Sequence, residues 1–96
     1  MKMVFIAYDE ANEGQVMGVL RDAGAANYTR WTEVQGKGTS SGPHLGTAVW
    51  PKRNHALLVA VEDAQAARIT EGVRRLRDTL TLKGVKAFVL PLEEVT

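Results

Sequence analysis

The stretch from residue 36 to residue 54 carries the residue types best suited to binding a small anion. Glycine lets backbone N–H groups approach a bound group closely, and glycines recur here at Gly36, Gly38, Gly42 and Gly46. Lys37 lies near one end of the stretch, and Lys52 and Arg53 lie near the other. The pattern therefore predicts either an anion-binding loop or, as the alternative, a flexible hairpin without a ligand.

Metal binding is a second kind of chemistry open to this chain, through its two histidines. Neutral imidazole is a common metal ligand, and His44 and His55 could ligate a metal with help from Asp or Glu. Two separate histidines are more often surface residues, so both interpretations stay open. The sequence contains no cysteine, which excludes disulfides, cysteine-based zinc sites and a thiol nucleophile.

Groups arranged for catalysis do not emerge from the spacing. Neither histidine can be combined with a serine and a carboxylate from sequence position alone, and the pair Glu93–Glu94 is typical of a solvated chain end. Asp9 and Glu10 follow the first predicted strand, where an acylphosphatase-type enzyme would bind phosphate, and their charges would repel it. We therefore expect a protein that is not an enzyme.

Nucleic-acid binding is disfavoured by charge and by aromatic content. The formal net charge is +1, which creates no general field attracting nucleic acid or an anionic membrane. An RNA-recognition module would need aromatic side chains on its third strand to stack bases, and the apolar run 56–61 has none. We expect no nucleic-acid partner.

These candidate residues must be positioned by a scaffold that the hydrophobic pattern describes. The 96 residues suffice for one domain, 1–96. β-Branched and apolar runs predict four strands, and apolar residues at helical spacing predict two helices. The expected strands are 3–8, 28–35, 56–61 and 85–90, and the expected helices are 12–23 and 63–80. The order βαββαβ predicts an α+β, ferredoxin-like fold, with a four-stranded antiparallel sheet and two helices on one face.

Local signals predict where the two helices begin and end. Asn12 and Gln15 have the spacing of a capping box for the first helix, and Gly24 is expected to end it. Asp63 is the expected N-cap of the second helix, whose apolar stripe runs to Leu80.

The strands are apolar on both faces, although two helices can cover only one face of such a sheet. In the first strand Met3, Phe5 and Ala7 share one face, opposite Val4 and Ile6. An exposed face would normally alternate apolar with polar residues. The pattern therefore predicts a homo-oligomer in which another subunit covers the second face; the alternative is a hydrophobic sheet that stays partly exposed.

The expected location is the cytoplasm. No apolar run approaches the roughly 20 residues that a membrane span needs. The apolar start of the chain is followed directly by Asp9 and Glu10, which argues against a signal peptide.

Two motifs resemble the PII signalling family. Thr32-Glu33-Val34-Gln35-Gly36-Lys37-Gly38 is similar to the S-E-V-x-G-x-G of that family. Ala87-Phe88-Val89-Leu90-Pro91-Leu92-Glu93-Glu94-Val95 is similar to its I-F-V-x-P-x-E-E-V, and element order agrees over nearly the whole chain. The resemblance implies a homotrimer with inward-facing sheets, small effectors such as adenine nucleotides in clefts between subunits, and no obligatory cofactor.

The resemblance also assigns roles to individual residues. By position, the effector-binding set comprises Gly36, Lys37, Gly38, Lys52 and Lys86. The long loop, called the T-loop in that family, would contact a partner protein. Its residues include Thr39, Ser40, Ser41, Gly42, Pro43, His44, Leu45, Gly46 and Trp50.

The sequence also departs from the classical family pattern. The loop is shorter and lacks the modified tyrosine, and Ser40 replaces a glutamine that helps bind 2-oxoglutarate. Residues 82–85 lack the Gly-Asp-Gly turn, and the C-terminal arginines have no counterpart in the 96 residues. Trp50-Pro51-x-x-Asn54 resembles instead PII-like variants associated with membrane transport, including heavy-metal efflux. We therefore expect a regulator of a partner such as a transporter; the alternative is a metal-responsive protein of the divalent-cation-tolerance type.

Overall fold

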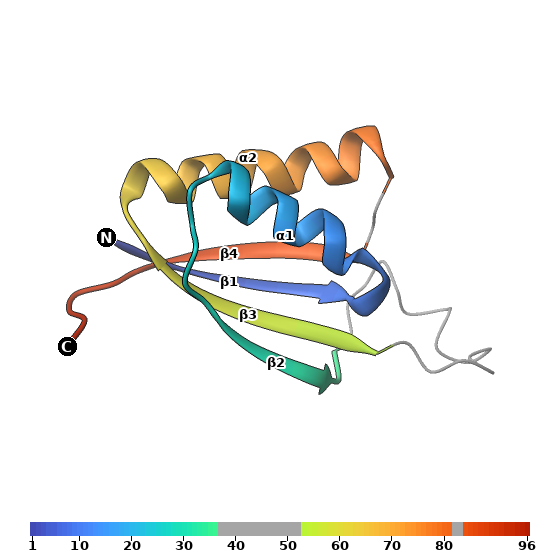
Figure 1. Cartoon of the computed structure of the whole chain (residues 1–96), viewed down its shortest axis with the longest axis horizontal. Helices are drawn as coiled ribbons and strands as arrows, with labels where there is room; N and C mark the ends of the chain where they lie inside the picture. Colours follow the sequence, from blue (N-terminus) through green and yellow to red (C-terminus); the bar gives the residue numbers. More distant parts are fainter. Residues whose placement is uncertain (37–52, 82–83) are drawn as a thin grey trace.

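The computed structural model describes residues 1–36, 53–81 and 84–96, and its elements follow the predicted order (Figure 1). They are β1 (Lys2–Asp9), the short 3-10 helix η1 (Glu10–Asn12), α1 (Glu13–Asp22), β2 (Thr29–Val34), β3 (Asn54–Val61), α2 (Asp63–Thr79) and β4 (Val85–Pro91). None of the helices in these ranges is long and apolar enough to cross a membrane.

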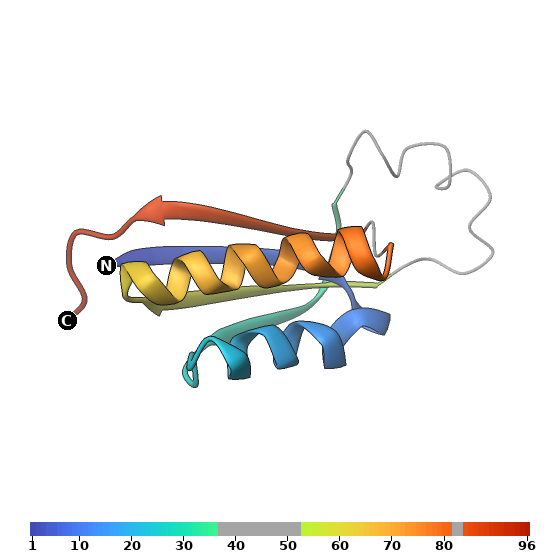
Figure 2. The same ribbon diagram turned by 90° about the horizontal axis from the view of Figure 1, so that it is seen from above.

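The four strands form one antiparallel sheet in the order β2-β3-β1-β4. Helices α1 and α2 both lie on one face of this sheet, as two perpendicular views show (Figures 1 and 2). The predicted ferredoxin-like fold is therefore confirmed. Because the strands are antiparallel, the C-terminal ends of β1 and β2 and the N-terminal ends of β3 and β4 share one end of the sheet, which we call the loop end.

The helix starts differ from two of the predictions. The Asn12 side chain makes no capping hydrogen bond. Asp9 instead accepts one from the Ala11 N–H at 2.9 Å, which begins η1 before α1 can start at Glu13. Helix α2 is capped by Glu62 rather than Asp63, in a reciprocal capping box with Gln65. Glu62 rather than Asp63 is the N-cap because Gln65, three positions after Glu62, has the side-chain amide that completes the capping box.

The end of α1 agrees with its prediction. Gly24 has φ +75°, and its N–H donates to Arg21 O while the Ala25 N–H donates to Leu20 O. This is a Schellman motif, in which glycine adopts the left-handed conformation without a Cβ penalty. At the end of α2, Leu80 lies outside the helix and is 50% exposed, so the apolar stripe ends before this residue, contrary to the prediction.

The hydrophobic core lies between the helices and the covered face of the sheet. Each fully buried aliphatic side chain contributes roughly 1.5–3 kcal/mol to folding. The most buried members are Val4, Ile6, Tyr8, Val16, Leu20, Leu57, Val59, Val61, Ile69, Val73 and Val85. Alternate residues of the strands therefore point at the helices, and their neighbours point at the opposite, uncovered face.

The uncovered face is apolar, as the strand pattern predicts. Phe5 and Phe88 are register partners on it, with ring centroids 5.9 Å apart. Phe88, Leu90 and Trp31 are each roughly half exposed, although they are large and apolar. We call this surface the open face.

A close approach of α1 and α2 depends on Gly72. A Cβ at this position would lie 2.7 Å from Val19 Cγ1, too close for the two helices to keep their present spacing. We expect Gly72→Ala to destabilise the protein by about 1–3 kcal/mol, because overpacking outweighs the better helix propensity of alanine.

Urea unfolding at one fixed protein concentration measures this cost. Gly14→Ala is the matched control, because nothing lies within 4 Å of a Cβ built there, so it should stabilise α1 by up to about 1 kcal/mol. A Gly72→Ala variant as stable as the Gly14→Ala variant would show that the helices do not need this glycine.

Candidate functional site

A hollow of about 400 Å³ lies on the open face, at the loop end of the sheet. Most of its lining residues are apolar. Its polar lining residues Gln35 and Asn54 lie with Gly36 at the end next to the 37–52 stretch, which we call its mouth. An apolar hollow with a few polar groups at one side is the usual form of a small-molecule site. Its remaining lining residues are Phe5, Ala7, Trp31, Val34, Ala56 and Leu58.

The register of the strands explains why the hollow forms here. Trp31 is the partner of Ala56, Ala56 of Ala7, and Ala7 of Lys86, so these residues form one row across all four strands. The two alanines leave the middle of the row empty. Phe5 and Leu58 rise from the next row and bound the space on that side.

A β-bulge in β2 brings the outer wall into place. Trp31 pairs with Ala56 and Val34 with Asn54, so Thr32 and Glu33 together oppose the single residue His55. Glu33 has φ +56°, which a non-glycine residue adopts only when its surroundings hold it there. Because of this extra residue, Trp31 and Val34 both face the hollow although they are three positions apart in the strand.

Two of the predicted effector-binding residues lie in the described part of the chain, and both lie at the loop end. Gly36 lines the mouth of the hollow, and Lys86 is the exposed member of the row beside Ala7. The other predicted residues, Lys37, Gly38 and Lys52, lie outside the described residues. So do the partner-loop residues Thr39, Ser40, Ser41, Gly42, Pro43, His44, Leu45, Gly46 and Trp50.

The predicted metal ligand His55 lies in a polar cluster on the helix side of the loop end. Its side chain is 14% exposed, and its Nδ1 lies 3.1 Å from Glu13 Oε1, while Nε2 lies 3.8 Å from Glu10 Oε2. Within residues 1–36, 53–81 and 84–96, no group of three or more His, Cys, Asp or Glu side chains could hold a metal ion. The other candidate, His44, lies outside these ranges.

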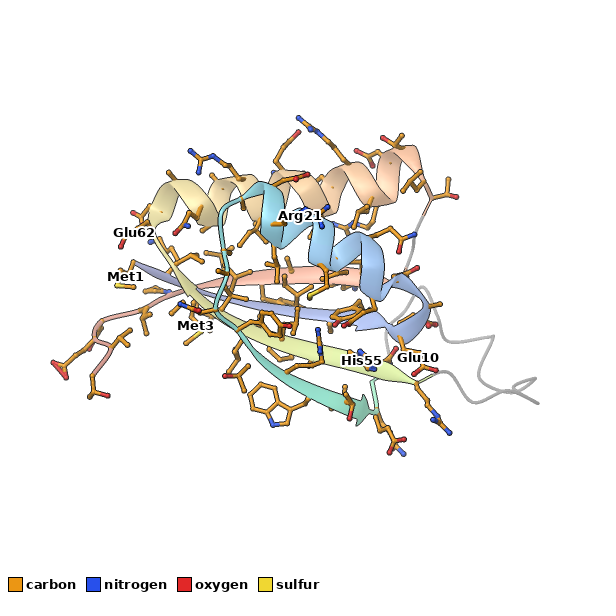
Figure 3. All side chains as sticks on the ribbon, viewed as in Figure 1. Met1, Met3, Glu10, Arg21, His55 and Glu62 are labelled. Carbon is orange, nitrogen blue, oxygen red and sulfur yellow. The ribbon has the colours of Figure 1, made fainter. Side chains whose placement is uncertain are left out.

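Glu13 is the centre of this polar cluster on the helix side of the loop end. Its carboxylate accepts a hydrogen bond from the Tyr8 hydroxyl, contacts His55 and forms an ion pair with Arg30. Arg30 also donates to the Tyr28 hydroxyl at 3.2 Å and lies over the Tyr28 ring. The labelled side chains of His55 and Glu10 show its place beside the start of β3 (Figure 3). The cluster therefore joins β1, η1, α1, β2 and β3.

Within this cluster the pKa values of Tyr8 and Glu13 are shifted in opposite directions. Burial raises the pKa of Tyr8 to about 12, and the neighbouring Glu13 carboxylate adds to the effect. Burial alone would raise the pKa of Glu13, but hydrogen bonds from Tyr8 and His55 and the charge of Arg30 outweigh it and lower that pKa. The cluster therefore favours protonated Tyr8 and ionised Glu13.

Backbone contacts at the loop end complete the support of the hollow. The Glu10 N–H donates to Arg53 O at 2.9 Å, and the Asp9 N–H donates to Gly84 O at 3.2 Å. The Arg53 guanidinium lies 3.5 Å from the Glu33 carboxylate, so the two chain segments that flank the 37–52 stretch are in contact. The turn after β1 thus anchors the chain where it enters β3 and β4.

A larger hollow of about 550 Å³ lies between α1 and α2, and none of the predicted site residues that the structure describes lines it. Gly18 and Gly72 line it, and their lack of a side chain leaves space between the two helices. Its charged rim is partly neutralised within α2, since Arg75 lies 3.7 Å from Glu71. The smaller hollow at the loop end is the better candidate, because the motif residue Gly36 lines it and Lys86 lies beside its lining residue Ala7.

Sequence reasoning missed Trp31, Tyr8, Glu13 and Arg30. The alternation of β2 would place Trp31 and Arg30 on opposite faces, but nothing local indicates the bulge beside them. Tyr8 and Glu13 meet only because η1 turns the chain between them, and no pattern predicted η1.

Comparisons with known proteins agree with this architecture. The family description "Nitrogen regulatory protein P-II" matches residues 1–96. CPII from Thiomonas intermedia K12 bound to ADP, AMP and acetate has a TM-score of 0.70 and 19% identity, over 92% of this chain and 81% of that one. Its structure with ADP and bicarbonate has a TM-score of 0.69 and 19% identity, over 93% and 82%.

A third similar structure comes from another organism, Thermus thermophilus. The crystal structure described as that of a PII-like signaling protein, TTHA0516, has a TM-score of 0.62 and 24% identity, over 93% of this chain and 82% of that one. No curated protein matches the sequence. Because the family description matches the whole printed chain, the protein belongs to the nitrogen regulatory protein P-II family.

The raised pKa of Tyr8 predicts a loss of stability in alkali. In the folded state Tyr8 keeps its proton up to about pH 12, whereas an unfolded tyrosine loses it near pH 10. The stabilisation is therefore complete below pH 10 and falls as pH rises toward 12, by about 2–3 kcal/mol. Tyr8→Phe should abolish this fall, although it also costs about 1–2 kcal/mol at neutral pH through the lost hydrogen bond to Glu13.

Urea unfolding at several pH values between 9 and 12 measures the effect. Tyr28→Phe is the control, because Tyr28 is the other tyrosine of the chain and is 42% exposed, so the fall should persist in it. An equally steep fall in the Tyr8→Phe variant would contradict the assignment.

Proposed function

We propose that the protein is a non-enzymatic, homotrimeric regulatory protein located in the cytoplasm. It binds a small effector, an adenine nucleotide or a similar anion, in clefts between subunits. It signals through the 36–54 loop to a partner such as a membrane transporter. Membership of the P-II family supports the regulatory role, and the sequence Trp50-Pro51-x-x-Asn54 supports the choice of partner.

The observation that carries the effector site is the arrangement at the loop end. Gly36 and Lys86 come from distant parts of the sequence, yet both lie beside one hollow of about 400 Å³. Lys86 supplies positive charge, and Gly36 offers backbone that a ligand can approach closely. The solved CPII structures are described as bound to ADP with AMP and acetate, or with bicarbonate, which supports adenine nucleotides and small anions as the first effectors to test.

The hollow also touches the base of the loop. Gly36 and Asn54 belong to its mouth, and they flank the stretch that includes the proposed partner-contacting residues. A ligand here could change the loop only through different affinity for two loop arrangements. This proximity supports an effector that is read out through residues 36–54.

The trimer is supported by the open face. Phe88 is 50% exposed and Leu90 is 47% exposed on a surface that the two helices leave uncovered. Large contiguous apolar surfaces of this kind mark contacts between proteins. Since strands β1, β3 and β4 all contribute apolar side chains to it, another copy of the same chain is the proposed cover. The metal-responsive alternative has no comparable support in the described residues.

Effector binding is testable by calorimetry with ADP, AMP, ATP and bicarbonate. At least one should bind, and Lys86→Gln should weaken a phosphate-bearing ligand about fivefold to twentyfold, because one charge-assisted contact is lost. Lys2→Gln is the control, since Lys2 lies at the opposite end of β1 from the hollow. Absence of heat with all four compounds would refute the effector assignment.

The trimer is testable by light scattering of the intact chain. The mass should be three times that of the 10.5 kDa chain, and Phe88→Glu should shift it toward monomer, since a charge on the open face opposes burial. Arg68→Glu changes an exposed residue of α2, which lies on the face of the sheet opposite the open face, and should leave the mass unchanged. A monomeric wild-type protein at micromolar concentration would contradict the proposal.

A further inference from the structure

Trp31 is the largest side chain lining the hollow, and no sequence motif gave it a role. It is 45% exposed, although it lies beside apolar neighbours that could have covered it. Its pairing with Ala56 places it on the open face, and the β2 bulge that follows places Val34 on the same face. Within one chain, an aromatic side chain is therefore left available at one wall of the hollow.

The row that contains Trp31 changes in chemical character from one end to the other. Trp31 stands at one end and Lys86 at the other, with Ala56 and Ala7 between them. Neighbouring strands lie about 4.8 Å apart, so three spacings separate the two end positions by about 14 Å. A ligand that lies along this row meets an aromatic wall first, a flat alanine floor next and a cation last.

The mouth of the hollow adds neutral hydrogen-bonding groups near the aromatic end. Gln35 and Asn54 carry amides, each with both donors and an acceptor. Such groups suit the edge of a heterocycle, which also presents donors and acceptors. A bare anion would gain from Lys86 but would leave the apolar floor and Trp31 without a contact.

We infer that Trp31 stacks on the ring of the effector and makes this site selective for a nucleoside phosphate over a ring-free anion. The inference rests on the proposed function, from which it takes an effector at the loop end. The ring lies on Ala7 and Ala56 against Trp31, and the phosphate is directed toward Lys86. Base–aromatic stacking of this kind tolerates different bases, since each base has a π-face.

The test uses Trp31 as its own reporter. The sequence has two tryptophans, so Trp50→Phe leaves Trp31 as the single emitter. In this background AMP and ADP should change the emission, and adenosine should do so more weakly. Pyrophosphate and bicarbonate, which lack a ring, should leave it unchanged.

Affinity measurements on variants give the second readout. Trp31→Leu should weaken AMP and ADP about tenfold and leave pyrophosphate unaffected, and Trp31→Phe should restore most of the loss. Tyr28→Leu is the matched control, because Tyr28 is an aromatic residue of similar exposure, 42% against 45% for Trp31, and does not line the hollow. Light scattering of each variant checks that the oligomer is intact.

The outcomes separate this inference from the proposed function. If calorimetry shows ADP binding but Trp31→Leu binds it as tightly as the wild type, the stacking role is wrong and the effector site stands. If Trp31→Leu instead breaks the oligomer, a second copy of the chain fills the hollow and the inference is overturned. If no effector binds the wild-type protein, both fail, and the calorimetric panel alone reveals it.

Discussion

The one-sided packing of two helices on a four-stranded sheet is the constraint on which the rest of this structure depends. Alternate strand residues such as Val4 and Ile6 bury themselves beneath α1 and α2, and this burial supplies most of the folding free energy. Their neighbours must then point to the other side. The fold therefore creates a second apolar surface as a direct result of building the first.

The loop end is where these two surfaces are linked. On the helix side, the Glu13 carboxylate is shared by Tyr8, His55 and Arg30. On the open side, the residues adjoining these in sequence, Ala7, Ala56 and Trp31, form the row of the hollow. Strands β1, β2 and β3 thus each contribute one residue to a polar anchor and an adjoining residue to a candidate binding surface, so the anchor fixes the positions of the hollow's walls.

The sequence predicts the architecture well because the signals that matter for it are periodic and local. The strand and helix patterns are long enough to identify every major element, and antiparallel order alone brings Gly36 and Lys86 to the same end of the sheet. The family motifs point to the same two residues. What the sequence does not reveal are contacts that depend on register, because a register is set by the whole sheet.

The missed features share this cause. The cap expected at Asn12 does not form, because the Asp9 side chain, three residues earlier, accepts a hydrogen bond from the Ala11 N–H and begins η1. That turn then brings Glu13 to Tyr8, a contact that spacing could not indicate. In the same way, the side of the sheet on which Val34 lies follows from the bulge at Thr32 and Glu33 rather than from its distance from Trp31 along the chain.

The bulge also has a consequence for how this surface can change during evolution. Because the bulge sets Thr32 and Glu33 opposite His55 alone, Trp31 and Val34 lie on the same side although they are three positions apart. A regular strand of the same sequence would present them to opposite sides. The chemistry of the hollow can therefore vary by ordinary substitution at its walls while its shape persists. Loss of one of the two bulge residues would leave Trp31 and the valine two positions apart and still on the same side. Loss or gain of a residue elsewhere in β2 would instead move part of the strand's side chains to the other face, so the bulge is where β2 can change length without changing which side chains face the hollow.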